Sequence, residues 1–156
     1  MRRDNRVKNY LSIFAALAFG TASLGICASE MGTPEEAKAM SLKAAALVDA
    51  QGDSAFAVFA EKEGGFLEKD LYVFCMDLDG NMLSHAVKPS LVGQNLKDFN
   101  KYGDFLFQDM IKVAASDGAG WVDYNWPYPG SDEVKQKTSY IIKNSHGFFC
   151  GVGAYK

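Results

Sequence analysis

The residue types that could take part in binding or catalysis gather in two short segments of the chain. Residues 120–127 (GWVDYNWP) hold both tryptophans together with Tyr124, and residues 137–140 (KTSY) add a cation and a phenol. Aromatic side chains with polar edges commonly line small-ligand pockets, and they are equally common in a core. A partly buried lysine needs an anionic partner, so Lys137 suits a carboxylate ligand. The plain alternative is a solvated Lys137 beside Lys135.

The two histidines of the chain occupy different surroundings. His146 lies in a predicted hairpin turn, where a solvated imidazole is expected. His85 lies near the end of a predicted strand among apolar neighbours, where it could donate a hydrogen bond to an anion or serve as a structural histidine. Neither residue has a recognisable nucleophile partner. Because no pair of residues is positioned by spacing for acid–base chemistry, we expect no enzymatic activity.

The sequence predicts neither a metal site nor a cofactor. Residues 77–81 (DLDGN) resemble the start of a calcium loop, but Gly80 is the fourth residue rather than the sixth and Lys88 replaces the glutamate needed at the twelfth. No Cys/His cluster indicates zinc. No helix follows Gly151 and Gly153, which argues against a phosphate-binding loop. These glycines are expected to let a neighbouring element approach the sheet closely.

Two cysteines, Cys75 and Cys150, lie in the apolar runs YVFCMD and FFCGVGAY. In an oxidising compartment they could form a disulfide. Both runs are typical of central strands, and disulfides between adjacent strands are often strained. We therefore favour two buried thiols, with a disulfide as the alternative.

The first 28 residues are typical of a secretory signal peptide. Four basic residues and one acidic residue within positions 1–9 precede an uncharged run over residues 10–28. We expect export to the bacterial periplasm, or else a membrane anchor formed by an uncleaved leader. Cleavage would leave 12 basic and 18 acidic residues, a net charge of −6. Nucleic acid is therefore not an expected partner.

Residues 29–156 are long enough for a single domain. Capping and periodicity predict a long helix over 34–51, a second helix that begins at Asp53, and a third over 105–115. Period-2 runs predict five strands, at 71–77, 82–87, 121–126, 138–143 and 148–155. Alternation places Tyr124 and Trp126 on one face of their strand and Trp121 on the other. The expected fold class is α+β with a five-stranded antiparallel sheet.

Five segments, taken in order, resemble the single Cache domain family (type 2), the extracytoplasmic PAS-like sensor module of bacteria. They are residues 72–85 (YVFCMDLDGNMLSH), 91–96 (LVGQNL), 120–127, 137–140 and 151–155 (GVGAY). The resemblance implies a long N-terminal helix, a five-stranded antiparallel sheet, and a pocket between the sheet and the loops and helix that cross it. Family members typically read Ala-His-Pro where this chain has Ser84-His85-Ala86.

The resemblance also implies a function and a set of ligand-binding residues. Many family members are the sensor halves of chemoreceptors or histidine kinases and recognise acetate, propionate, pyruvate or lactate. Lys137 and Tyr140 would pair with the carboxylate, His85 would donate a hydrogen bond, and Tyr124 and Trp126 would enclose the alkyl tail. The full set of implied pocket residues is His85, Trp121, Tyr124, Trp126, Lys137 and Tyr140.

The expected partners are a small carboxylate and a membrane receptor or kinase. The given chain ends at Lys156, directly after the last strand, so we expect another protein to carry a signal across the membrane. A second hypothesis makes the domain an interaction module that docks on such a receptor or forms a homodimer through its N-terminal helix. Small residues at positions 37, 44 and 45 would permit close approach of two helices.

Overall fold

A six-stranded antiparallel sheet runs through residues 31–156, the part of the chain that the computed structural model describes. The strands are β1 (Leu67–Glu68), β2 (Leu71–Met76), β3 (Met82–His85), β4 (Ala119–Pro127), β5 (Val134–Lys143) and β6 (Phe149–Tyr155). Their order is β1-β2-β6-β5-β4, and β3 pairs with β2. All five predicted strands are present, and the two-residue β1 is an unpredicted sixth. The signal peptide or anchor expected over residues 1–28 lies outside the described residues.

Helix α1 (Pro34–Gln51) begins with the predicted capping box. The Thr33 hydroxyl accepts from the amide of Glu36, and the Glu36 carboxylate accepts from the amide of Thr33. The helix packs on β5 and β6 through a stripe of small side chains, including Ala37, Ala44 and Ala45. Because these alanines are buried within the domain, they are not available to a second helix, and the expected route to a homodimer lacks its surface.

Helix α2 (Ala55–Ala60) is shorter than predicted. A 3-10 turn, η1 (Gly52–Ser54), precedes it, and another, η2 (Lys62–Gly64), follows it. Within α2, Phe59 is fully buried, whereas Ala60, the last residue of the helix, is exposed.

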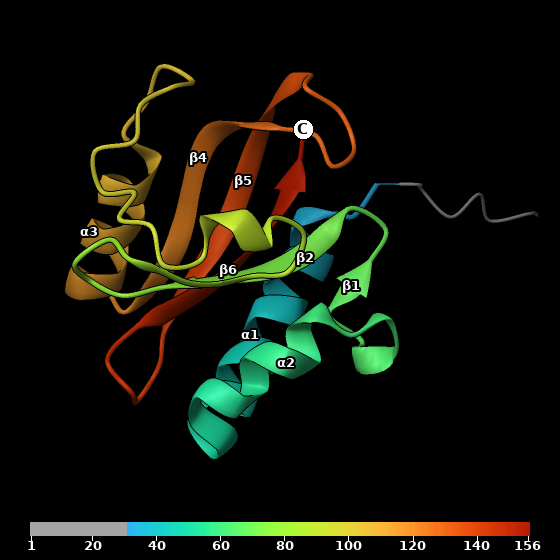
Figure 1. The fold of residues 1–156 in the computed structure, drawn as a ribbon, viewed down its shortest axis with the longest axis vertical. Helices are drawn as coiled ribbons and strands as arrows, with labels where there is room; N and C mark the ends of the chain where they lie inside the picture. Colours follow the sequence, from blue (N-terminus) through green and yellow to red (C-terminus); the bar gives the residue numbers. More distant parts are fainter. Residues whose placement is uncertain (1–30) are drawn as a thin grey trace, which may run out of the picture.

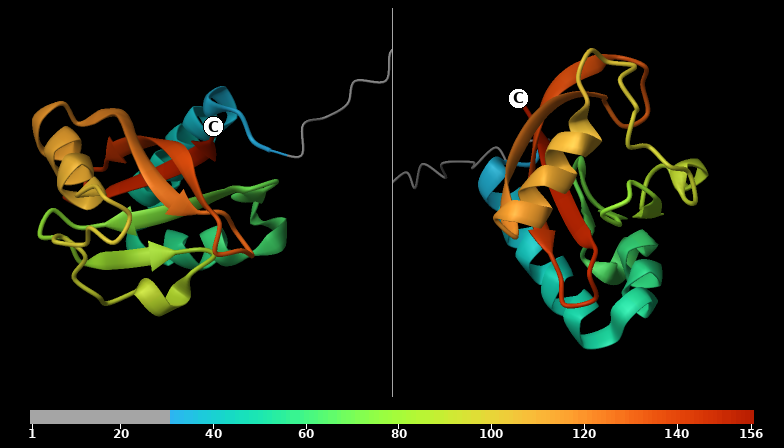
Figure 2. Two further views of the ribbon diagram at one scale, coloured as in Figure 1. Left: turned by 90° about the horizontal axis from the view of Figure 1, so that it is seen from above. Right: turned by 90° about the vertical axis from the view of Figure 1, so that its left-hand side faces the viewer.

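The helices divide the core into two layers, one on each face of the sheet. Figures 1 and 2 show α1 and α2 gathered at one side of the sheet, away from α3 (Leu106–Ser116). Helix α3 and the segment 86–105, which includes the 3-10 turn η3 (Pro89–Leu91), cover the other face. Within residues 31–156, no helix is both long and apolar enough to cross a bilayer.

Cys75 and Cys150 form a disulfide, so the favoured interpretation of two free thiols is wrong. The two residues are paired directly across β2 and β6, with their Cα atoms 4.1 Å apart. Side chains directly opposite on antiparallel strands leave the sheet on the same face. Both sulfurs lie in the core on the α1 face. The register of two strands 75 residues apart, which the sequence alone does not reveal, brings them together.

Candidate ligand-binding site

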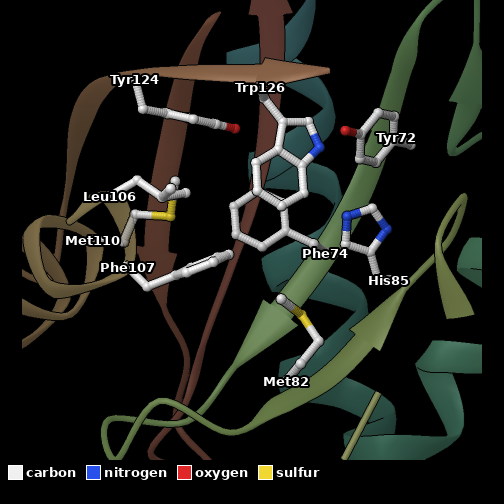
Figure 3. Close-up of a pocket in the computed structure, with 9 residues that line it drawn as sticks. All are labelled: Tyr72, Phe74, Met82, His85, Leu106, Phe107, Met110, Tyr124 and Trp126. Atoms are coloured by element: carbon white, nitrogen blue, oxygen red, sulfur yellow. The ribbon is translucent and has the colours of Figure 1, made fainter. Parts of the chain in front are cut away.

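A narrow pocket opens in the core on the α3 face of the sheet; its cavity volume is about 10 Å³, room for about one water molecule, and the space between its walls reaches about 230 Å³ when the solvent at its mouth is included. β2, β3, β4 and α3 supply its walls, as Figure 3 shows. Most of the lining is apolar or aromatic, which is typical of a small-ligand site. The lining residues are Tyr72, Phe74, Met82, His85, Leu106, Phe107, Met110, Tyr124 and Trp126.

Trp126 lines the pocket and is surrounded by aromatic rings. Its ring centroid lies 5.8 Å from that of Phe99, 5.7 Å from that of Tyr102 and 6.0 Å from that of Phe107. Phe99 and Tyr102 belong to the segment 86–105 that crosses this face. The indole is therefore held between the sheet and the covering segment, and its position defines one wall of the cavity.

His85 presents a defined hydrogen-bond donor to the pocket. Its Nδ1 accepts a hydrogen bond from the backbone amide of Lys88 at 3.1 Å. Burial lowers the pKa of His85 to about 3, with further lowering by the positive charges of Lys137 and Lys88. The imidazole is therefore neutral near pH 7, and its proton is on Nε2. In Figure 3 that nitrogen faces the space between Trp126 and Tyr72.

Lys137 is the buried cation that the sequence suggested. Its side chain is only 1% exposed, and Nζ lies 4.0 Å from the ring centroid of Tyr72 and 4.2 Å from that of Tyr155. Within the described residues, Nζ has no hydrogen-bond partner. Burial lowers the pKa of Lys137 to about 7, an effect that the Asp70 carboxylate opposes and the charge of Lys88 increases. The solvated alternative is therefore wrong.

Lys137 does not line this cavity; it lines a neighbouring hollow together with Asp104 and Asp123, and Tyr124 lines both. Tyr72 lines the pocket and also carries Nζ on its ring. Room for the lysine stem comes from Gly153, where an added Cβ would lie 2.5 Å from Cε of Lys137 and 2.2 Å from Oγ of Ser139. The atoms close to Gly153 belong to side chains of the paired strand β5 rather than to another element packed on the sheet, so this glycine makes room within the sheet. Ser139 Oγ is in turn 2.7 Å from the Tyr124 hydroxyl.

Trp121 and Tyr140 lie on the opposite face of the sheet, so their expected place in the pocket is wrong. They pair across β4 and β5, with ring centroids 5.0 Å apart, and the ammonium of Lys38 on α1 lies over the Tyr140 ring. Trp121 is 41% exposed. The physical reason is strand alternation: residues 137 and 140 are three positions apart and cannot share a face of a regular strand. One carboxylate therefore cannot contact both of them within this sheet.

Sequence reasoning missed two polar contributors to the site, Tyr72 and Lys88, and also the apolar lining residues Phe74, Met82, Leu106, Phe107 and Met110. Tyr72 shares its strand face with Phe74, so alternation along β2 could have revealed it. Lys88 holds His85 through its backbone amide and places Nζ 5.2 Å from the ring centroid of Trp126. Lys88 comes from an irregular segment next to η3, where no periodicity reports which way a side chain points. The structure thus adds a second cation beside the pocket.

Comparison with known proteins places this arrangement in a family. The family model for the Cache domain (dCache_2) matches residues 34–156. A relative, the methyl-accepting chemotaxis protein McpP of Pseudomonas putida, is 36% identical over 90 residues, which are 56% of this chain. The aligned stretch is only 16% of the length of McpP, so this chain corresponds to a small part of that receptor.

Two solved structures share the fold. One is described as the structural basis for carboxylic acid recognition by a Cache chemosensory domain; it has a TM-score of 0.67 and 26% identity, with 78% of this chain and 91% of that chain covered. The other, a periplasmic sensor domain of a chemotaxis protein, has a TM-score of 0.59 and 29% identity, with 78% and 88% covered. Cache domains are extracytoplasmic sensor modules of receptors. The helix, the sheet and the matched length together confirm the resemblance seen in the sequence: this chain belongs to the Cache domain family.

Proposed function

We propose that the domain is a sensor that binds a small carboxylate in the pocket around Trp126 and performs no chemistry on it. One observation carries the proposal: a buried ammonium without a hydrogen-bond partner among the described residues adjoins an aromatic cavity into which a neutral imidazole points. Such a site has unmet attraction for an anion. Similarity to a Cache chemosensory domain that is described as recognising carboxylic acids supports this ligand class.

The proposed roles divide between the polar and the apolar walls. Nε2–H of His85 donates to a carboxylate oxygen, and the positive charge of Lys137 attracts the anion from behind Tyr72. Phe107, Met110 and Trp126 enclose the short alkyl tail, because all three line the same cavity. The lining contains no carboxylate, thiol or aliphatic hydroxyl that could act as a nucleophile. Binding without turnover is the function that this set of side chains supports best.

The location and the partner belong to the same proposal. We place the domain in the periplasm, with a membrane receptor or kinase carrying its signal inward. The sensor domains that it matches come from chemotaxis proteins, one of them described as periplasmic. An acidic domain without a cluster of Lys and Arg gives no reason to expect nucleic acid as a partner.

The ligand class can be tested by calorimetric titration with acetate, propionate, pyruvate and lactate. Propionamide, which keeps the alkyl tail and removes the charge, is the matched control ligand. We expect the acids to bind and propionamide not to bind. Binding of the amide as tightly as the acid would show that the ammonium plays no part, and absence of binding by every acid would refute the proposal.

Two lysines of the same strand provide a matched pair of variants. Lys137→Ala should weaken carboxylate binding by about 1.5–3 kcal/mol, the range for a lost hydrogen bond or ion pair to a charged group. Lys135→Ala removes a lysine whose Nζ lies 3.4 Å from the Glu133 carboxylate, at the surface, and should leave binding unchanged. Equal effects of the two substitutions would mean that the domain attracts anions only through its overall charge.

A further inference from the structure

Two residues of the turn before β2, Lys69 and Asp70, contact the start of α1. Asp70 is 5% exposed, and its Oδ1 accepts a hydrogen bond from the backbone amide of Gly32, just before the helix. In the same turn, Nζ of Lys69 lies 2.7 Å from the Glu36 carboxylate. An added Cβ on Gly32 would lie 2.3 Å from Cγ of Leu71, so the chain entering α1 is packed tightly against the start of β2.

The same Asp70 also interacts with the buried cation beside the pocket. Its carboxylate acts on the charge of Lys137 and on the phenol of Tyr155, which pairs with Lys137 across β5 and β6. The second carboxylate oxygen, Oδ2, is buried and has no hydrogen-bond partner among the described residues. Asp70 therefore has one oxygen committed to Gly32 and one that is free to respond to charge near Lys137.

An anion in the pocket changes the balance of charge around Asp70. The charged groups that act on Lys137 are the carboxylate of Asp70 and the ammonium of Lys88, the imidazole of His85 feels its charge, and the rings of Tyr72 and Tyr155 lie against its Nζ. Lys137 also lines a hollow together with Asp104 and Asp123. A bound carboxylate adds a second negative charge near the ammonium on which Asp70 acts, and two negative charges at one buried site repel each other. The free energy of the Asp70 carboxylate in its present position must rise.

We propose that Asp70 couples the pocket to the chain that enters α1: occupation of the pocket by an anion weakens the hydrogen bond between Asp70 and the amide of Gly32. This inference rests on the proposed function, because it needs an anionic ligand near Lys137. The coupling is reciprocal. A change that weakens the hydrogen bond between Asp70 and the Gly32 amide must therefore strengthen ligand binding. The gain in binding free energy equals the free energy by which the bound ligand weakens that hydrogen bond.

The other end of α1 offers a matched control. There the Oδ1 of Asp49 accepts from the amide of Ser145 at 2.8 Å. Asp49 and Asp70 each accept a hydrogen bond from one backbone amide at an end of α1, that of Ser145 and that of Gly32. The groups that act on the Asp49 carboxylate are Ser145 and His146, and neither lines the pocket. A ligand that acts through Asp70 should change exchange of the Gly32 amide and leave the Ser145 amide unaffected.

The test is amide hydrogen exchange, measured by NMR on the full chain with and without saturating propionate at pH 5.5. We expect propionate to speed exchange of the Gly32 amide by about fivefold or more, the lower end of typical couplings, with no change at Ser145. In Asp70→Asn, which keeps an acceptor for Gly32 and removes the charge, the response should vanish and propionate should bind about fivefold more tightly. Asp49→Asn should alter neither quantity.

The outcomes separate this inference from the proposed function. If propionate binds the unaltered chain but exchange at Gly32 does not respond, the coupling is wrong and the carboxylate site stands. If Asp49→Asn tightens binding as much as Asp70→Asn does, Asp70 acts only through overall charge. If no carboxylate binds, both proposals fall. A response at Gly32 that persists in Asp70→Asn would also overturn the coupling, because the charge would then play no part.

Discussion

The two faces of the sheet are built differently. Against α1 and α2 lies a closed core of aliphatic and phenylalanine side chains together with the disulfide. The Ser41 hydroxyl buried there donates to the carbonyl of Tyr140 at 2.9 Å, whereas Nδ2 of Asn144, in the turn beside the end of α1, has no hydrogen-bond partner among the described residues. On the α3 face, aromatic rings surround a cavity, and the ammonium of Lys137 lacks a hydrogen-bond partner among the described residues.

This difference separates the part of the domain that supplies stability from the part that is incomplete without a ligand. Buried polar groups are almost always paired in folded proteins, so unpaired ones indicate a missing partner. Groups with strongly shifted pKa values also concentrate at functional sites. The lowered pKa values of His85 and Lys137 both belong to the α3 face. Five experiments test whether the two faces differ in this way.

The largest effect on stability is expected from the α1 face. Phe59→Ala removes a fully buried ring whose centroid lies 4.8 Å from that of the Phe66 ring. We expect a loss of about 3–5 kcal/mol in the free energy of unfolding, measured by chemical denaturation, while the folded fraction keeps its affinity for carboxylates. Leu42→Ala, on the exposed side of α1 at 54% exposure, is the control and should have little effect. A small loss of unfolding free energy in Phe59→Ala would contradict the assignment of stability to the α1 face.

In contrast to Phe59→Ala, a substitution at Lys137 should increase the free energy of unfolding. Replacement of a buried charge by an apolar side chain of similar shape often stabilises a protein, so Lys137→Met should raise the free energy of unfolding by about 1–3 kcal/mol and weaken carboxylate binding as Lys137→Ala does. Folding lowers the pKa of Lys137 from 10.5 to about 7. The cost of the lysine is therefore fully present below pH 7 and disappears as the pH rises toward 10.5. The gain in Lys137→Met should shrink over that range, and a destabilised variant would contradict the argument.

Gly153→Ala tests the space that holds the lysine stem. The new methyl group would meet Ser139 and Lys137, and overpacking of this kind costs about 1–3 kcal/mol. Because Lys137 must move, carboxylate affinity should fall as well. Gly151→Ala is the comparison variant, since its methyl group would meet Ile141 and Phe74 instead; it should destabilise the fold without changing the pH dependence of binding. Normal ligand affinity in Gly153→Ala would show that the position of Lys137 is not critical.

Carboxylate affinity should depend on pH through Lys137. With a pKa of about 7 in the empty domain, the ammonium is present below pH 7 and is lost above it. Affinity should be nearly constant from pH 5 to pH 6.5 and should then fall by up to about tenfold per pH unit. His85, with a pKa of about 3, stays neutral over this range. Affinity that rises above pH 7 would be incompatible with an anion site at Lys137.

The smallest effects on carboxylate affinity are expected from Trp121 and Tyr140, which lie on the face of the sheet opposite the pocket. Trp121→Ala and Tyr140→Ala should change carboxylate affinity by no more than about 0.5 kcal/mol, the usual limit for sites away from the binding site. Trp126→Ala, on the same strand as Trp121, should remove most of the binding because its indole forms a wall of the cavity. Equal losses from Trp121→Ala and Trp126→Ala would mean that both faces of β4 contact the ligand.

The local elements could be predicted because their signals are local. The capping box at Thr33 and Glu36 fixes the start of α1, and period-2 runs locate the strands to within a few residues. The one strand missed, β1, has two residues, too few for any alternation to show. The error at Tyr140 arose differently: the family resemblance suggested a pocket residue, whereas alternation from Lys137 already excluded it.

Contacts between distant segments were beyond the reach of periodicity. Spacing along the chain did not show that Cys75 would lie opposite Cys150, that Lys88 would reach His85 and Trp126, or that Asp70 would hold Gly32. Each contact depends on strand register or on the path of an irregular segment. These are set by how the whole core packs.

By itself, the sequence determined the order of the helices and strands, the family to which they belong, and the shared face of Tyr124 and Trp126, because helix caps and side-chain alternation are written in neighbouring residues. Only the tertiary structure decided which charged groups meet. The burial of Lys137 between two tyrosine rings, the neutral state of His85 and the anchor from Asp70 to Gly32 all arise from packing between strands, since burial and electrostatic fields depend on neighbours that are distant along the chain.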